Sequence, residues 1–130
     1  MIVVDASALL EVLLRAPAAE AVERRLFESR ETLHAPHLID LEVAQVLRRY
    51  ATAGEIDQAR GLEALADLAD LPMRRYPHHL FLTRLWELRN NFTAYDAAYV
   101  ALAEALDAPL LTRDRRLASA AKLYVPIELA

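Results

Sequence analysis

Apolar residues along the chain form short β-branched runs separated by longer stretches with helical spacing. The short runs predict strands, because buried parallel strands appear as continuous apolar segments. They lie at residues 2–4, 32–35, 72–76, 109–112 and 124–125. Apolar positions three or four residues apart predict the helices. These are residues 6–14, a segment with Pro17 in its first turn, a segment opened by Pro36 and ending near Gly54, a helix capped by Asp57, and residues 80–89, 93–106 and 114–121.

Helices and short strands alternate along all 130 residues, which are enough for one domain with its own core. The order predicts one α/β domain over residues 1–130, a three-layer sandwich whose short, mainly parallel sheet is flanked by helices. Residues 124–125 are expected to form an edge strand. In such a sheet the strand C-termini and the helix N-termini share one edge, where ligands of these folds bind.

Four acidic residues are predicted at that edge of the sheet. Asp5 ends the first strand, Asp114 follows the fourth, and Asp96 and Glu42 lie in the first two turns of their helices. Asp5, Asp96 and Asp114 also fit helix-capping roles. Glu42 lies inside an apolar stripe, where a carboxylate is costly unless it is protonated or paired with an arginine or a bound cation.

Four converging carboxylates would raise one another's pKa and destabilise the metal-free protein. A hard divalent cation with oxygen ligands, Mg²⁺ or Mn²⁺, resolves this repulsion. Ser7 either hydrogen-bonds the Asp5 carboxylate or a metal-bound water, or is an ordinary first-turn serine. Thr112 either orients such a water or simply ends its strand. Tyr95 and Tyr99 are interpreted as core residues or walls of the site.

Composition and charge narrow the picture. The absence of cysteine excludes disulfides, zinc–thiolate sites and cysteine nucleophiles. No apolar run approaches the ~20 residues that span a bilayer, and the start does not resemble a signal peptide, so we expect a cytoplasmic protein without a membrane partner. The 55% apolar content leaves surface for a partner or a second copy.

The net charge of −4 argues at first against a nucleic-acid partner. If the four candidate acids are set aside, however, the remaining acidic residues equal the 15 basic residues in number. All the basic residues except Lys122 are arginines, which suit paired contacts with phosphate. The arginines beside Asp114 are candidate RNA contacts, although a solvated helix face explains them equally well: Arg113, Arg115 and Arg116.

Four segments together resemble the PIN domain, and more narrowly the VapC-type toxins of bacterial toxin–antitoxin pairs: VVDASALLEVL (3–13), IDLEVAQVLRR (39–49), FTAYDAAYVALAEAL (92–106) and LTRDRRLA (111–118). The resemblance assigns the family's acidic positions to Asp5, Glu42, Asp96 and Asp114, and its hydroxyl positions to Ser7 and Thr112. It implies a Mg²⁺- or Mn²⁺-dependent endoribonuclease. It also implies a homodimer that a cognate antitoxin inhibits by covering the site.

On this hypothesis Asp5, Asp96 and Asp114 hold the metal, while Glu42 either completes its ligand shell or accepts a proton from the attacking water. Other functions stay open at this point. A receiver-like, Mg²⁺-binding regulator usually needs a lysine at a strand end, and the chain offers only Lys122. A degenerate PIN scaffold without activity and a nuclease that cuts DNA are the further alternatives.

Overall fold

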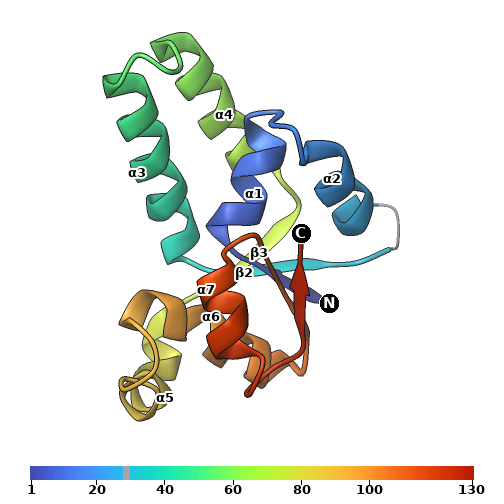
Figure 1. Ribbon diagram of the computed structural model, residues 1–130, viewed down its shortest axis with the longest axis vertical. Helices are drawn as coiled ribbons and strands as arrows, with labels where there is room; N and C mark the ends of the chain where they lie inside the picture. Colours follow the sequence, from blue (N-terminus) through green and yellow to red (C-terminus); the bar gives the residue numbers. More distant parts are fainter. Residues whose placement is uncertain (28–29) are drawn as a thin grey trace.

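The computed structural model describes residues 1–27 and 30–130, and within them it contains one five-stranded sheet (Figure 1). The sheet order is β3-β2-β1-β4-β5, and every neighbouring pair of strands is parallel. The strands are β1 (Ile2–Val4), β2 (Leu33–Pro36), β3 (Met73–Tyr76), β4 (Leu110–Thr112) and β5 (Ile127–Leu129). The predicted α/β class with a parallel sheet is therefore confirmed.

The direction of strand addition reverses between β1 and β4, and the helices divide between the two faces of the sheet accordingly. Right-handed crossovers place the helices after β1 and β2 on one face and those after β3 and β4 on the other. The first group is α1 (Ala6–Leu13), α2 (Ala19–Phe27), α3 (Leu38–Thr52) and α4 (Gln58–Asp70). The second group is η1 (His78–Phe81), α5 (Leu82–Glu87), α6 (Ala94–Leu106) and α7 (Arg115–Ala121). Figure 1 shows the three layers, with α3 and α4 packed side by side.

The core lies between the sheet and these helices. All of β1 is buried, and α6 packs against β1, β2 and β4. Residues 97–103 of α6 are buried without interruption. Four of these seven are alanines, whose small side chains let the helix lie close to the sheet. A buried α6 fixes its N-terminal turn, and with it Asp96, at the edge where β1 and β4 end.

Two prolines do not occupy the helical positions predicted for them. Pro36 is the buried last residue of β2, in register with Tyr76, and α3 begins only at Leu38. The backbone N–H of His37 donates to the Tyr76 carbonyl at 2.8 Å, which extends the strand pairing past the proline. Pro17 lies in the turn before α2 rather than in its first turn.

The predictions for the last strand and for the helix at 80–89 also need correction. Residues 124–125 are not a strand, because the N–H groups of Tyr124 and Val125 both donate to the Ala121 carbonyl and complete the turn after α7. The edge strand follows three residues later as β5. The helix begins earlier than predicted, as the short 3₁₀ turn η1, and continues as α5.

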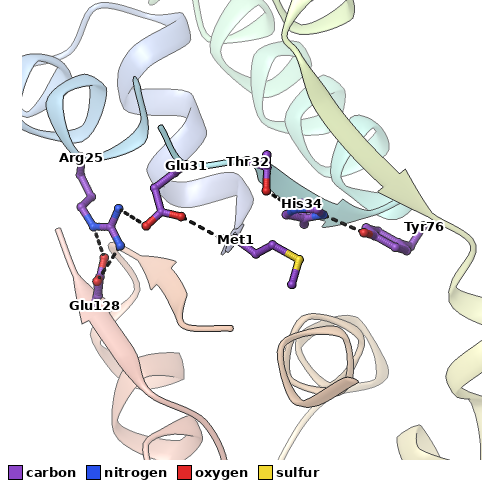
Figure 2. A network of polar contacts seen from close by, with 7 residues as sticks. All are labelled: Met1, Arg25, Glu31, Thr32, His34, Tyr76 and Glu128. Atoms are coloured by element: carbon purple, nitrogen blue, oxygen red, sulfur yellow. Dashed lines mark hydrogen bonds and ion pairs between the residues drawn. The ribbon is translucent and has the colours of Figure 1, made fainter. Parts of the chain in front are cut away.

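Polar contacts join distant segments on the side of the molecule drawn in Figure 2. Arg25 of α2 donates to Glu128 of β5 at 2.6 and 2.9 Å and to Glu31 at 3.1 Å. His34 lies buried between Thr32 and Tyr76, with ring-nitrogen distances of 2.8 and 2.7 Å to their hydroxyls. Burial lowers the pKa of His34. These contacts link α2, β2, β3 and β5, and none involves the four candidate carboxylates.

None of the helices in residues 1–27 and 30–130 combines the length and the apolar character needed to cross a membrane.

Candidate active site

Asp5 lies at the C-terminal end of β1, beside the point where the strand order reverses. Its side chain is 6% exposed and accepts three hydrogen bonds. Oδ1 accepts from the Ala8 N–H at 3.2 Å, which makes Asp5 the N-cap of α1, and from Ser7 Oγ at 2.7 Å. Oδ2 accepts from Thr112 Oγ1 at 2.7 Å. The carboxylate is therefore held in one orientation by groups from both α1 and β4.

The hydroxyls of Ser7 and Thr112 fix this orientation. Each accepts a hydrogen bond from a backbone N–H group and donates its own hydrogen to Asp5. Ser7 Oγ accepts from the Arg113 N–H at 2.9 Å, and Thr112 Oγ1 accepts from the Asp114 N–H at 3.0 Å. Each hydroxyl hydrogen then points toward Asp5. Of the alternatives considered for Ser7, the structure has the hydrogen bond to the carboxylate, and Thr112 does more than end its strand.

Glu42 lies half-buried in α3 and faces α6. Tyr99, which is 2% exposed, donates its hydroxyl to Glu42 Oε1 at 2.6 Å. The arginine partner that would explain a carboxylate in this apolar stripe does not occur, because no basic group of the described residues lies within ion-pair distance of Glu42. The sequence predicts Tyr99 as a core residue or a wall of the site; it is a core residue, and it also holds Glu42. Its spacing of three residues from Asp96 placed it on the same face of α6 and was the available signal.

Asp96 and Asp114 differ in whether their carboxylates accept helix-capping hydrogen bonds. Thr93 Oγ1 accepts from the Asp96 N–H at 3.1 Å, but the Asp96 carboxylate has no hydrogen-bond or ion-pair partner among the described residues. Only half of the predicted capping box is formed. Asp114 is exposed and caps α7, with Oδ1 accepting from the N–H groups of Arg116 and Leu117 at 3.0 and 3.1 Å. Its Oδ2 is left open toward solvent.

The four carboxylates lie within electrostatic reach of one another. Burial raises the pKa of Asp5, and the charge of Asp114 raises it further. Burial likewise raises the pKa of Glu42, with additional repulsion from Asp5 and Asp96. The pKa of Asp96 is raised by burial and then by Asp114, against a smaller lowering by Arg116. Each carboxylate thus repels at least two of the others, although they come from four separate segments.

Within the described ranges, no three Asp, Glu or His side chains lie close enough together to hold a metal ion as they stand. The donor set nevertheless fits a hydrated Mg²⁺ or Mn²⁺. It consists of carboxylate oxygens, and buried Asp5 and half-buried Glu42 have no ion-pair partner among the residues that the structure describes. Mg²⁺ keeps several of its waters and binds proteins through one or two carboxylates, so it does not need a closed cage of ligands.

The structure separates the three candidate arginines. Arg113 forms an ion pair with Glu11 of α1, with Nε and Oε1 3.1 Å apart. Arg116 faces Asp96 closely enough to lower its pKa. Arg115 is exposed at the first position of α7.

An apolar groove of about 770 Å³ begins beside Glu42 and follows α1 and α3. Glu42, Ser7 and Arg113 line it together with apolar side chains of the two helices and Tyr95. Leu41, on the rim of the groove, is 75% exposed. We use "apolar groove" below for the surface formed by Leu10, Leu14, Leu38, Leu41, Val46 and Tyr95.

Comparison with known proteins gives consistent matches. The PIN domain family model matches residues 2–123. A VapC ribonuclease of Mycobacterium bovis is 46% identical over 98% of this chain and 96% of its own length. Ribonuclease VapC12 of Mycobacterium tuberculosis is 44% identical over 99% and 98%.

Two solved structures share the fold. PAE2754 of Pyrobaculum aerophilum superposes with a TM-score of 0.70 at 26% identity, over 97% of this chain and 87% of that one. VapC20 of Mycobacterium tuberculosis, a toxin that cleaves the sarcin–ricin loop, gives a TM-score of 0.71 over 92% and 95%. At 16% identity, the second comparison supports the fold alone.

Proposed function

The chain belongs to the PIN domain family, and from that premise we propose that it is a metal-dependent endoribonuclease, the toxin of a toxin–antitoxin pair, with one nuclease domain over residues 1–130. Relatives named VapC ribonucleases align over nearly all of the chain. The observation that carries the proposal is the placement of four carboxylates from separate segments at one edge of the sheet, where their charges repel one another and none has an ion-pair partner within the described ranges. Such repulsion costs stability, and a bound cation offsets it.

In this proposal Asp5, Asp96 and Asp114 hold Mg²⁺ or Mn²⁺, directly or through water. The bound ion would supply Lewis-acid chemistry, lowering the pKa of a water and shielding charge on the phosphoryl oxygens. Ser7 and Thr112 keep the Asp5 carboxylate in a single orientation through the hydrogen bonds described above. Preorganised ligands of this kind lose little freedom when an ion or a substrate binds.

Glu42 either completes the set of ligands or accepts a proton from the water that attacks the RNA phosphodiester. Burial raises its pKa, which makes its carboxylate a stronger base. Hydrolysis then proceeds in line, with the leaving oxygen opposite the attacking water. Arg113, Arg115 and Arg116 are proposed to contact flanking phosphates.

We further propose that an apolar segment of the cognate antitoxin occupies the apolar groove and that the toxin is a homodimer. The groove reaches the candidate site at Glu42 and Ser7, so an inhibitor seated in it also covers that part of the site. Amphipathic helices bind apolar grooves of this kind through regularly spaced side chains. The receiver-like alternative is not favoured, because Lys122 lies at the C-cap of α7 rather than at a strand end.

The direct test is cleavage of RNA and DNA, measured side by side with the purified chain in Mg²⁺, Mn²⁺ and excess EDTA. We expect RNA to be cut in either metal, DNA to stay intact, and EDTA to stop the reaction. Glu42→Gln and Asp96→Asn serve as matched inactive proteins against a contaminating nuclease. Cleavage that persists in EDTA or in both variants would contradict the proposal.

A further inference from the structure

A second hollow, of about 430 Å³, lies between helix α7 and the turn that joins α5 to α6. Asp96 lines its wall, whereas Glu42 lines the apolar groove, so the two hollows reach the proposed site through different carboxylates. The lining is mostly polar. We call it the polar hollow and define it by Arg89, Asn90, Asn91, Asp96 and Arg116.

The polar hollow carries two guanidinium groups, of Arg89 and Arg116, that form no ion pair with any residue in the described ranges. Within the described residues, Arg116 forms no ion pair or side-chain hydrogen bond, and its charge acts on Asp96. Arg89 donates to the Trp86 carbonyl at 2.8 Å and lies 4.4 Å from the centre of the Trp86 ring. Its charge is therefore positioned but not neutralised. Guanidinium groups in this state suit a phosphate, which they bind through paired hydrogen bonds.

Two amides lie beside these charges. Asn91 donates to the Tyr124 hydroxyl at 2.9 Å, which holds the turn in place. Asn90 is exposed, and its amide has no partner among the described residues. A free amide offers both a donor and an acceptor, the pattern that reads the edge of a base. The volume lies within the range of small-ligand sites and has room for about one nucleotide.

From this arrangement we infer that the polar hollow binds the RNA nucleotide next to the cleaved bond. Arg116 and Arg89 contact its phosphate, and Asn90 hydrogen-bonds its base. The inference rests on the proposed ribonuclease function and adds a subsite that sets sequence preference. An acidic peptide would also pair with the two arginines. If the polar hollow bound such a peptide in place of RNA, substitutions in the hollow would not change the affinity for RNA.

The test measures binding of short single-stranded oligo(A), oligo(C) and oligo(U) in EDTA as a function of salt. In Arg116→Gln, we expect the slope of log affinity against log salt to fall by about 0.7, equally for all three RNAs. Arg116→Lys keeps the charge and should restore the slope. Asn90→Ala should leave the slope unchanged and reduce the discrimination between RNAs by about fivefold. Arg48→Gln removes an exposed arginine of α3 outside both hollows and should change neither quantity.

Equal slopes in Arg116→Gln and Arg48→Gln would overturn the inference, and so would an unchanged base preference in Asn90→Ala. A separate cleavage assay of the wild-type chain in Mg²⁺ distinguishes the two levels of the argument. Absence of cleavage there contradicts the proposed function itself. If the wild type cleaves RNA but the polar-hollow variants bind RNA in the same way as Arg48→Gln, the subsite alone is contradicted.

Discussion

At the scale of single residues, capping a helix and binding a cation are compatible roles for one carboxylate. Asp114 uses Oδ1 for both of its capping bonds and leaves Oδ2 open. Asp5 caps α1 through Oδ1 while both of its oxygens accept from hydroxyls. A carboxylate has about four acceptor positions, so each residue keeps capacity for a further ligand. A structural explanation for such an acid therefore does not count against a catalytic one.

Asp96→Asn tests the repulsion with little structural disturbance, because the Asp96 carboxylate has no hydrogen-bond partner in the described part of the chain. Its pKa is raised in the folded state above the ordinary value of 3.8. The folded chain therefore holds this proton more tightly than the unfolded chain does. The resulting stabilisation is complete below pH 3.8 and is lost as the pH rises through the raised pKa.

In EDTA at pH 7 we accordingly expect Asp96→Asn to melt a few degrees above the wild type, with the difference shrinking toward pH 4. Cleavage should fall by more than about a hundredfold, beyond the usual effect of residues that only support a ligand. Asp67→Asn, which removes an exposed carboxylate of α4, is the control for both measurements. A metal-free variant no more stable than the wild type at pH 7 would rule out the repulsion.

Tyr99→Phe removes only the hydroxyl that positions Glu42. The loss leaves the ring in the core, so we expect a stability decrease of about 1 kcal/mol, typical of one hydrogen bond. Cleavage should fall by about tenfold, as for residues that orient a metal ligand. Tyr76→Phe is a matched control, because it also removes a hydrogen-bonded hydroxyl, from the side chain paired with His34.

The same prediction has an internal check. In a Glu42→Gln background, Tyr99→Phe should cost little of the residual cleavage, because the carboxylate that the hydroxyl positions is already absent. If the two losses of activity simply multiply, the Tyr99 hydroxyl acts independently of the Glu42 carboxylate.

At the scale of elements, local capping chemistry was predictable and strand ends were not. The predicted N-caps Asp57, Thr93 and Asp114 are all confirmed, because a side-chain oxygen that accepts from the next turn leaves a local signature. Pro36 and Tyr124 were misplaced because their conformations depend on partners far along the chain or on the end of the preceding helix. The register of a short strand is set by its neighbours in the sheet.

The candidate site shows the same division. Asp5 and Asp114 follow strand ends, so their placement at one edge followed from the alternation of elements. The bond between Tyr99 and Glu42 depends on how α6 faces α3, which no local pattern specifies. The sequence also did not predict that Arg113 and Arg116 have different surroundings, because these depend on which helix packs beside each side chain.

The apolar groove gives a prediction for the α3 element. Leu41→Glu places a charge on its exposed rim, so binding of the cognate antitoxin should weaken while RNA cleavage stays near the wild-type rate. Leu62→Glu is the matched control on α4, since Leu62 is 70% exposed and lies outside the groove. The check is growth of cells that express toxin and antitoxin together. Equal neutralisation of the two variants would place the antitoxin elsewhere.

At the scale of the whole molecule, the candidate site exists only when the chain is folded. The four carboxylates come from four segments. They meet where the direction of strand addition reverses, at the edge of the sheet where α1, α3, α6 and α7 begin. The excess of acidic over basic residues equals the number of these carboxylates. Folding therefore concentrates negative charge at one edge, at a cost in stability that a bound cation offsets.

A cation that binds only this folded arrangement must stabilise the whole chain. At a free cation concentration of about a hundred times its Kd, the free energy of unfolding rises by about 2.7 kcal/mol. At about 4 °C per kcal/mol for a domain of this size, Mg²⁺ or Mn²⁺ should raise the Tm by about 10 °C relative to EDTA.

Glu42→Gln should reduce that rise, whereas Asp67→Asn should retain it, although both remove one negative charge. Calorimetry on the three proteins separates a specific site from general screening, because screening depends on net charge and would treat the two variants alike. A rise of the same size in Glu42→Gln as in the wild type would place Glu42 outside the set of ligands.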